Sequence, residues 1–229
     1  MKSIVVMPAY NAAKTLSAVA NNIPSIITEV ILVDDFSSDD TVIQAEKLNI
    51  RVIRHSNNKG YGANQKTCYK AALKSGADIV VMVHPDGQYD PSRLAMIISN
   101  FNDGTVGAVY GSRMTGPFSL KGPMPLWRYF SNIVLGRIAN FVTAASLSDW
   151  HTGYRGYTKS ALEAIDFEKF PNGFEFDTSM TLALLKNKIS IIEIPVPVKY
   201  FPDASSINFI RSIKYGFNFL LQIVTWKKL

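Results

Sequence analysis

Cysteine, acidic residues and long apolar runs are all scarce in this 229-residue sequence, and each scarcity excludes a class of protein. The single cysteine, Cys68, rules out an internal disulfide framework and is compatible with the cytoplasm. The last apolar stretch has a charge-free run of only 12 residues, Tyr215–Trp226, whereas crossing a bilayer takes roughly 20. Hydrophobic residues still make up 47% of the chain, which excludes a disordered protein.

Acidic residues are missing altogether from two long segments, 104–148 and 204–229. These segments hold eight of the 24 Lys and Arg residues and none of the 18 Asp and Glu residues, so the net charge of +6 belongs to them. Both are also rich in large apolar residues, and this combination indicates an anionic membrane surface or a lipid phosphate. Nucleic acid is the alternative partner for basic, aromatic-bearing segments, but the sequence carries no nucleic-acid-binding signature.

The first 110 residues alternate short β-type runs with helical stretches, which predicts an α/β fold with a mostly parallel sheet flanked by helices. The predicted strands are Ser3–Met7, Glu29–Val33, Arg51–Arg54, Asp78–Val83 and Gly107–Tyr110. The predicted helices are Ala13–Asn22, Thr41–Leu48, Tyr61–Ser75 and Pro91–Phe101. Ligands in such folds bind beyond the carboxyl ends of the strands, and polar clusters follow the strands here.

The second half is less regular. Gly111–Pro125 contains three Gly and three Pro, which indicates a loop. Further elements are predicted as helices over Leu126–Ala145, Phe174–Asn187 and Asn208–Trp226 and a strand over Ile189–Ile194. We expect one catalytic domain over residues 1–206, followed over 207–229 by an amphipathic helix at the membrane interface that forms no separate domain.

The segment VDDFSSDDT at Val33–Thr41 places two carboxylates, Asp34 and Asp35, at the end of a buried strand. Buried carboxylates are costly unless they have partners, and a nucleotide offers base N–H and ribose hydroxyl groups. The alternative is that these acids, with Ser37 and Ser38, cap the next helix.

The segment HPDGQYDP places Asp86, Gln88 and Asp90 at alternate positions after another apolar strand. Oxygen ligands in this pattern suit Mg²⁺ or Mn²⁺, which also bind a diphosphate and neutralise the charge of a leaving nucleoside diphosphate. A polar turn with a helix cap before Pro91 is the alternative. His84 is compatible with a metal ligand, a ribose contact or a structural histidine.

The segment NKGYGA opens a long predicted helix and contains Gly60 and Gly62. Glycines allow the backbone to approach a ligand closely, and a helix N-terminus favours anions. An ordinary turn accounts for the same residues. A dinucleotide fingerprint is excluded, because that pattern belongs after the first strand.

The ordered series of motifs resembles glycosyltransferase family 2. It comprises VVMPAYN, VDDFSSDDT, NKGYGA and HPDGQYDP, in that order. Later segments are similar to the polyprenyl-phosphate branch of the family, which includes dolichyl-phosphate mannosyltransferase: GSR at 111–113, DWHTGYR at 149–155, GFEFD at 173–177 and EIPVPVKYFPDASS at 193–206.

The resemblance implies a GT-A fold, a nucleoside-diphosphate sugar donor such as GDP-mannose or a UDP-sugar, and a Mg or Mn cofactor. Asp86 and Gln88 match the last two positions of a DxDxQ-like metal motif, whose first position is His84 here. Imidazole is a softer ligand than carboxylate. The nucleotide contacts that it implies are Pro8, Ala9, Tyr10, Asn11, Asp34, Asp35, Gly60 and Gly62.

A polyprenyl phosphate acceptor carries its own anionic nucleophile, so the enzyme has to hold two anions together with cations. Arg113, Arg128, Arg155 and Lys199 are the candidates. Lys199 stands where related sequences often carry Arg, which would bind phosphate bidentately. Ser131 lies three residues after Arg128, so the two share a helix face and are suited to bind one phosphate together.

Three carboxylates are candidates for the catalytic site, namely Asp86, Asp149 and Asp177. If the acceptor were a hydroxyl group, a carboxylate would have to act as base, and Asp177 is our first choice. A helix-capping aspartate accounts for Asp177 equally simply.

The resulting hypothesis is an inverting transferase on the cytoplasmic face of a membrane, alone or with a membrane partner subunit. The alternatives are a transferase acting on a sugar hydroxyl of a glycan or glycolipid, and a non-catalytic sugar-nucleotide-binding protein.

Overall fold

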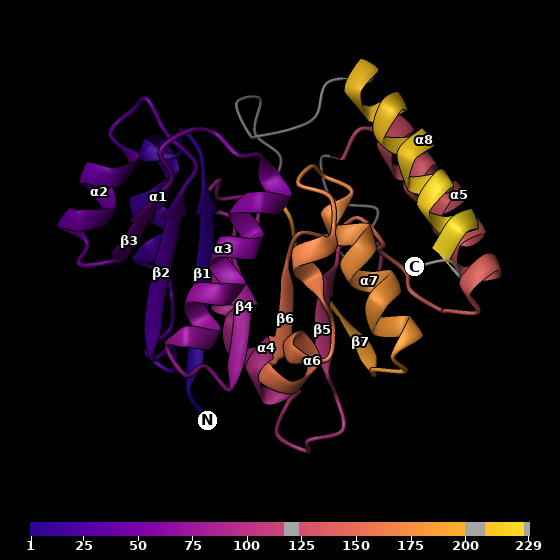
Figure 1. Ribbon diagram of the computed structural model, residues 1–229, viewed down its shortest axis with the longest axis horizontal. Helices are drawn as coiled ribbons and strands as arrows, with labels where there is room; N and C mark the ends of the chain where they lie inside the picture. Colours follow the sequence, from indigo (N-terminus) through magenta and orange to yellow (C-terminus); the bar gives the residue numbers. More distant parts are fainter. Residues whose placement is uncertain (117–123, 200–208, 227–229) are drawn as a thin grey trace.

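A computed structural model describes residues 1–116, 124–199 and 209–226. Its centre is a seven-stranded sheet in the order β3-β2-β1-β4-β6-β5-β7 (Figure 1). The strands are β1 Ser3–Ala9, β2 Glu29–Asp34, β3 Arg51–Arg54, β4 Ile79–Met82, β5 Ala108–Ser112, β6 Arg155–Thr158 and β7 Ile191–Pro195. The helices are α1 Ala13–Ala20, α2 Thr41–Lys47, α3 Tyr61–Lys74, η1 Pro91–Arg93, α4 Leu94–Ser99, α5 Leu126–Thr143, α6 Lys159–Glu163, η3 Phe167–Lys169, α7 Phe176–Lys186 and α8 Phe209–Thr225.

Helices cover both faces of the sheet, and the sequence of β1 shows why. Side chains alternate between the two faces of a strand, so Ile4 and Val6 enter one core while Val5 and Met7 enter the other. The first core also takes in residues of α3, α6 and α7, and the second those of α1, α2 and α4. A strand that is apolar on both faces needs a helical layer on each side. The predicted α/β architecture is therefore confirmed.

Strand β6 was not predicted, and it runs antiparallel to both of its neighbours, β4 and β5. The other described strand pairs are parallel. Gly156 brings β6 close to α4, because a methyl group at this position would lie 2.8 Å from Cγ2 of Ile97. The four residues of β6, Arg-Gly-Tyr-Thr, lack the apolar run that marks β1 and β4, which is why the sequence did not reveal it.

The C-terminal helix α8 lies beside α5 at one edge of the molecule (Figure 1). Phe219 and Ile223 of α8 are buried in the first core. Two polar side chains of the same helix reach the body of the protein: Asn218 donates to the Glu175 carboxylate, and Gln222 donates to the Ser179 hydroxyl at 2.8 Å. Helix α8 is thus fixed to the rest of the fold by an apolar seam and hydrogen bonds.

No helix within the described ranges is both long and apolar enough to cross a membrane. Strand β5 continues to Ser112, two residues into the segment that the sequence predicted as a loop. Residues 117–123 of that loop, and 207, 208 and 227–229 of the predicted C-terminal segment, lie outside the described residues.

Candidate active site

A cleft of about 1640 Å³ opens at the carboxyl ends of β1, β2 and β4. The polar segments that the sequence placed after three separate strands meet here, as expected for parallel strands. The predicted site residues that line it are Pro8, Ala9, Tyr10, Asn11, Asp35, Gly60, His84, Asp86, Gln88, Arg113, Arg128, Ser131 and Asp177.

Asn11 ties the loops after β1 and β2 together. Its side-chain oxygen accepts a hydrogen bond from the backbone N–H of Ser38 at 2.9 Å, and its own N–H donates to the Ser37 hydroxyl at 2.8 Å. Asn11 and Phe36 both have left-handed backbone conformations, with φ of 52° and 67°. Asparagine tolerates this region better than most residues, so Asn11 shapes the cleft wall as well as lining it.

Asp34 turns away from the cleft, which corrects the expectation that both carboxylates of this segment reach the nucleotide. Its side chain is fully buried, accepts from the backbone N–H of Ser37 at 3.2 Å and forms an ion pair with Arg54 at 3.3 Å. It is not among the residues that line the cleft. Asp34 therefore holds the loop after β2, but it does not cap α2, whose N-cap residue is Asp40.

Asp35 lines the cleft and shapes the approach to α3. Its two oxygens accept hydrogen bonds from the backbone N–H groups of Lys59 and Gly60, each at 2.9 Å. One oxygen also lies 2.7 Å from Nδ1 of His55. Asp35 thereby fixes the turn in which Gly60 adopts φ of 95°, a conformation that favours glycine.

Gly62, the second glycine of the NKGYGA segment, has a different function from the one expected. A methyl group at Gly62 would lie 2.6 Å from the Pro171 carbonyl oxygen and 2.7 Å from Cβ of Phe176. Gly62 lies outside the cleft lining. It permits α3 to pack closely against α7, so the prediction that it approaches the nucleotide is corrected.

The predicted metal segment forms a tight turn after β4. One oxygen of Asp86 accepts from the backbone N–H of Gln88 at 3.0 Å, and both side chains line the cleft with His84. Asp90 instead accepts from Ser92 N–H at 2.9 Å and caps η1, so the polar-turn alternative holds for this residue.

Among the described residues, no three or more His, Cys, Asp or Glu side chains gather as a ready-made metal cage. A Mg²⁺ or Mn²⁺ ion that bridges a diphosphate takes only a few protein ligands, because phosphate oxygens and water supply the others. The set of one imidazole, one carboxylate and one amide along the cleft fits this kind of ion.

Tyr61, the first residue of α3, joins the metal segment to α7, and no sequence motif indicated this function. Its hydroxyl donates to Oδ2 of Asp177 at 2.7 Å and lies 3.3 Å from Nε2 of His84. Its ring stacks on His84 at 5.6 Å and contacts Phe174 at 4.8 Å. Burial and the neighbouring Asp177 raise the pKa of Tyr61 well above its ordinary value. The other Asp177 oxygen accepts from Gln65 at 3.1 Å.

Asp149 does not line the cleft but positions Arg113, which does. The guanidinium Nε and Nη2 atoms donate to the two carboxylate oxygens at 2.7 and 2.8 Å, and the Arg113 backbone N–H adds a third bond at 3.0 Å. Burial alone would raise the pKa of Asp149, but Arg113 holds it below its ordinary value. The expectation that Asp149 sits beside the sugar is corrected.

Arg155 is fully buried under the cleft, which corrects its assignment to the acceptor phosphate. Its guanidinium donates to the backbone carbonyls of Asp177 at 2.7 Å, Thr152 at 2.8 Å and Trp150 at 3.1 Å. The last of the cationic candidates, Lys199, is exposed after β7 and lies outside the cleft lining. Its backbone N–H donates to the Gln88 carbonyl at 2.8 Å.

Helix α5 forms the opposite wall of the cleft. Arg128 and Ser131 line this wall as predicted from their three-residue spacing, and the Arg128 guanidinium lies 5.1 Å from the centre of the Trp127 ring. The remaining lining residues of α5 are Trp127, Phe130, Asn132, Val134 and Leu135. The cleft therefore has one polar wall at the strand ends and one apolar, basic wall on α5.

His151 also lines the cleft, although the sequence suggested no function for it. Its Nδ1 atom lies 2.9 Å from the Tyr215 hydroxyl of α8, and its backbone N–H donates to Asp149 at 3.2 Å. Burial lowers the pKa of His151 to about 4. A neutral histidine thus connects the C-terminal helix to the Arg113–Asp149 pair.

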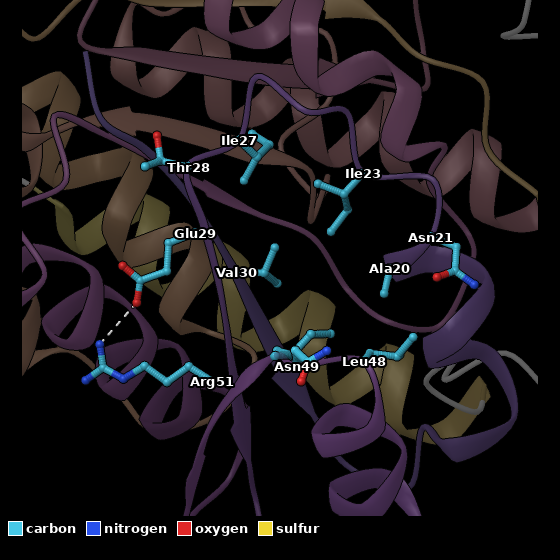
Figure 2. Close-up of a pocket in the computed structure, with 11 residues that line it drawn as sticks. Ala20, Asn21, Ile23, Ile27, Thr28, Glu29, Val30, Leu48, Asn49 and Arg51 are labelled. Atoms are coloured by element: carbon cyan, nitrogen blue, oxygen red, sulfur yellow. Dashed lines mark hydrogen bonds and ion pairs between the residues drawn. The ribbon is translucent and has the colours of Figure 1, made fainter.

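A smaller pocket of about 360 Å³ lies at the opposite end of the strands (Figure 2). Glu29 and Arg51, an ion pair at 3.2 Å, stand on one side of it. Apolar side chains such as Ile23, Ile27 and Leu48 surround the rest. No predicted site residue lines this pocket, which leaves the larger cleft as the candidate active site.

Comparisons with known proteins identify the family of this chain. A sequence model of the family described as Glycosyl transferase family 2 matches residues 4–166. The UDP-N-acetylglucosamine–dolichyl-phosphate N-acetylglucosaminyltransferase of Methanococcus voltae is 29% identical, over 86% of this chain and 85% of its own. Polyprenol monophosphomannose synthase of Mycolicibacterium smegmatis is 25% identical, over 85% of this chain and 76% of its own.

A solved structure of glucosyl-3-phosphoglycerate synthase from Mycobacterium tuberculosis, in complex with Mn²⁺, UDP and phosphoglyceric acid, superposes with a TM-score of 0.75. The match covers 98% of this chain and 78% of that chain at 14% identity, so it bears on the fold alone. The family match spans more than half of the sequence and includes the strands that build the cleft. The chain belongs to glycosyltransferase family 2, with the GT-A fold.

Proposed function

We propose that this enzyme transfers a hexose, with inversion, from a nucleoside-diphosphate sugar to a polyprenyl phosphate at the cytoplasmic face of a membrane. The observation that carries the proposal is the pairing of two unlike walls in one cleft. Carboxylate, amide and imidazole groups at the strand ends face a wall that carries Arg128, Ser131 and apolar side chains. A sugar nucleotide suits the first wall, and a lipid phosphate suits the second.

On the donor side, the nucleoside is expected along Pro8, Ala9 and Tyr10, next to Asp35. The diphosphate then lies toward Asp86 and Gln88. His84, Asp86 and Gln88 would hold a Mg²⁺ or Mn²⁺ ion, which would supply Lewis-acid stabilisation of the leaving diphosphate. GDP-mannose and UDP-sugars both satisfy this arrangement, and the relatives include a UDP-N-acetylglucosamine-dependent enzyme and a phosphomannose synthase.

On the acceptor side, the enzyme has to overcome repulsion between two anions. Arg113, held by its bidentate pair with Asp149, and Arg128 on α5 line the same cleft and supply the positive charge. A phosphate oxygen is anionic at neutral pH, so positioning and electrostatic stabilisation suffice without a strong base. Asp177 suits this mechanism, because both of its oxygens accept hydrogen bonds, from Tyr61 and Gln65.

The exposed apolar residues of α5 and α8, some of which also line the cleft, support attachment to a membrane. These residues recur at intervals of three or four positions, so each helix presents one apolar stripe. The stripe residues are Trp127, Phe130, Val134, Ile138 and Phe141 on α5 and Phe217, Leu221 and Val224 on α8. Since the two helices pack together, the stripes are suited to insertion among lipid headgroups.

The test is transfer of labelled sugar from GDP-mannose and from UDP-N-acetylglucosamine to polyprenyl phosphate in liposomes, with Mg²⁺ or Mn²⁺. We expect a polyprenyl-phosphate sugar from at least one donor. Asp86→Ala is expected to abolish the product while keeping the wild-type melting temperature. Transfer to a glycan or glycolipid hydroxyl but not to phosphate, or donor binding without turnover, would overturn the proposal in favour of the corresponding alternative.

A further inference from the structure

We propose that His84 is a metal ligand through Nδ1, and that Tyr61 and Asp177 fix its tautomer, so that the cleft selects Mn²⁺ over Mg²⁺. This rests on the proposed function only in assuming that a cation bridges the donor diphosphate. The departure from an all-oxygen ligand set then sets the metal preference of this enzyme.

The packing of Gly153 shows which edge of the imidazole lies against the backbone. A methyl group at Gly153 would lie 3.0 Å from both Cδ2 and Nε2 of His84, so this edge of the ring abuts the backbone at residue 153. In a five-membered imidazole, the nitrogen away from the Cδ2–Nε2 edge is Nδ1. Nδ1 is therefore the ring nitrogen directed away from Gly153, and His84 itself lines the cleft.

Hydrogen bonding determines which nitrogen carries the proton. The Tyr61 hydroxyl has one proton, and it donates that proton to Asp177 at 2.7 Å. Toward Nε2 of His84, 3.3 Å away, the hydroxyl is left with acceptor capacity only. The proton of the ring therefore sits on Nε2, and Nδ1 keeps its lone pair. Within the described ranges, Nδ1 has no hydrogen-bond partner.

This arrangement is the one that metal-binding histidines commonly have. A ligating histidine donates its other N–H to a carboxylate, carbonyl or water, which orients the ring and raises its basicity. Here Tyr61 relays the hydrogen bond from His84 to Asp177. The stacking of Tyr61 between His84 and Phe174, and the bond from Gln65 to Asp177, hold the relay in place.

The donor set accounts for the expected selectivity. Mg²⁺ strongly prefers oxygen ligands, whereas imidazole nitrogen is better suited to first-row transition metals. With His84, Asp86 and Gln88 the cleft offers one nitrogen and two kinds of oxygen. Replacing His84 by a carboxylate would restore an all-oxygen set and favour Mg²⁺.

Metal binding is measured directly by the electron paramagnetic resonance signal of free Mn²⁺, with UDP or GDP present and protein-free nucleotide as the blank. Competition with Mg²⁺ gives the ratio of the two affinities. We expect the wild type to favour Mn²⁺ by about tenfold or more. His84→Asp should shift this ratio toward Mg²⁺ by a similar factor. Tyr61→Phe, which keeps the ring and loses the hydroxyl, should weaken Mn²⁺ binding by about 10-fold to 100-fold.

Asp90→Asn is the matched control, because this neighbouring carboxylate caps η1 outside the cleft and its loss should leave Mn²⁺ binding unchanged. Circular dichroism and melting temperature establish that each variant is folded. Equal wild-type affinity for the two metals, or a ratio unaffected by His84→Asp, overturns the proposal. So does unchanged Mn²⁺ binding in Tyr61→Phe.

Failure of the proposed function gives a different result. Mn²⁺ selectivity that depends on His84, without sugar transfer to polyprenyl phosphate, would refute the function and uphold the metal assignment. Transfer to polyprenyl phosphate, with no effect of His84→Asp on the ratio of the Mn²⁺ and Mg²⁺ affinities, would uphold the function and refute the metal assignment.

Discussion

The carboxylate of Asp149 and the guanidinium of Arg113 meet edge to edge through two hydrogen bonds of 2.7 and 2.8 Å, with the carboxylate wholly removed from solvent. The pair places a cation in the cleft wall while its counter-charge stays behind the wall. Removing the carboxylate charge takes away the counter-charge that this pair gives to Arg113, whose side chain is only 12% exposed. Asp149→Asn should therefore cost about 3–5 kcal/mol in the free energy of unfolding and also reduce transfer.

Urea denaturation of a double variant separates these two effects. Arg113→Met with Asp149→Leu removes both charges, and apolar replacement of a buried pair is often close to neutral for stability. We expect the double variant to recover most of the lost stability and none of the transfer activity. Recovery of both would show that Arg113 has no function in binding or catalysis.

His151 makes the protein less stable in mild acid. Its pKa is lowered by burial to about 4, whereas an unfolded histidine has an ordinary value near 6.5. As pH falls below 6.5, the unfolded chain binds the proton and the folded protein does not, so stability is lost between about pH 6.5 and 4. The loss should approach about 3 kcal/mol by the lower end of this window.

Comparing wild type with His151→Gln at pH 7.5 and pH 4.5 isolates this contribution. The lowered pKa of Asp149 acts only below the ordinary value of 3.8, outside the window. The pKa of Glu193, raised by burial, works in the opposite direction and is common to both proteins. An equal acid-induced loss in the variant would contradict the assignment to His151.

The effect of an Asp177 substitution on turnover distinguishes a phosphate acceptor from a hydroxyl acceptor. If the acceptor phosphate is the nucleophile, Asp177→Asn removes no general base and disturbs the hydrogen bonds to Gln65 and to Tyr61, through which Asp177 is linked to His84. The turnover number should then fall by less than about 100-fold, at the low end of what loss of a general base costs. A fall of about 10⁴-fold would instead identify a general base and favour a hydroxyl acceptor.

Arg128 and Arg155 should respond oppositely to substitution, although the sequence assigned both to the acceptor. Arg128 lines the cleft on α5, so Arg128→Ala should raise the KM for polyprenyl phosphate with little change in melting temperature. Arg155 bonds three buried backbone carbonyls, and Arg155→Met leaves them unpaired at about 1–3 kcal/mol each. Steady-state kinetics and thermal unfolding of the two variants check this, and a stable Arg155→Met with a raised KM would reverse the correction.

The strand ends of the first half could be predicted because, in an α/β fold, an apolar run followed by a polar cluster marks a buried strand and the loop that leaves it. The segments after β1, β2 and β4 therefore meet in the cleft as expected. The burial and the bonding partners that a neighbouring strand gives to each side chain could not be predicted from the sequence. Asp34 and Asp35 are adjacent, yet the first is buried and pairs with the exposed Arg54, whereas the second lines the cleft.

The correction of Arg155 has a definite cause, the undetected strand β6. The motif GYR by itself is compatible with an arginine that binds phosphate. In the structure, Arg155 belongs to β6 and its side chain is buried in the core. Tyr61 and His151 were missed for a related reason. Their partners, Asp177 and Tyr215, are 116 and 64 residues away in the chain, and no local pattern encodes such a contact.

The apolar stripes make a separate prediction about membrane binding. Phe141 of α5 and Phe217 of α8 are 89% and 69% exposed, so Phe141→Ser with Phe217→Ser should leave the core intact, unlike truncation of α8, which would remove the buried Phe219 and Ile223. Each aromatic side chain inserted into lipid contributes on the order of 1.5–3 kcal/mol, so the pair should weaken binding to anionic vesicles at least tenfold. Ile43→Ser is the matched control, because Ile43 is 48% exposed on α2, away from both stripes (Figure 1). Co-sedimentation with phosphatidylglycerol vesicles measures all three proteins, and equal binding of the double variant and the control would show that α5 and α8 do not face the membrane.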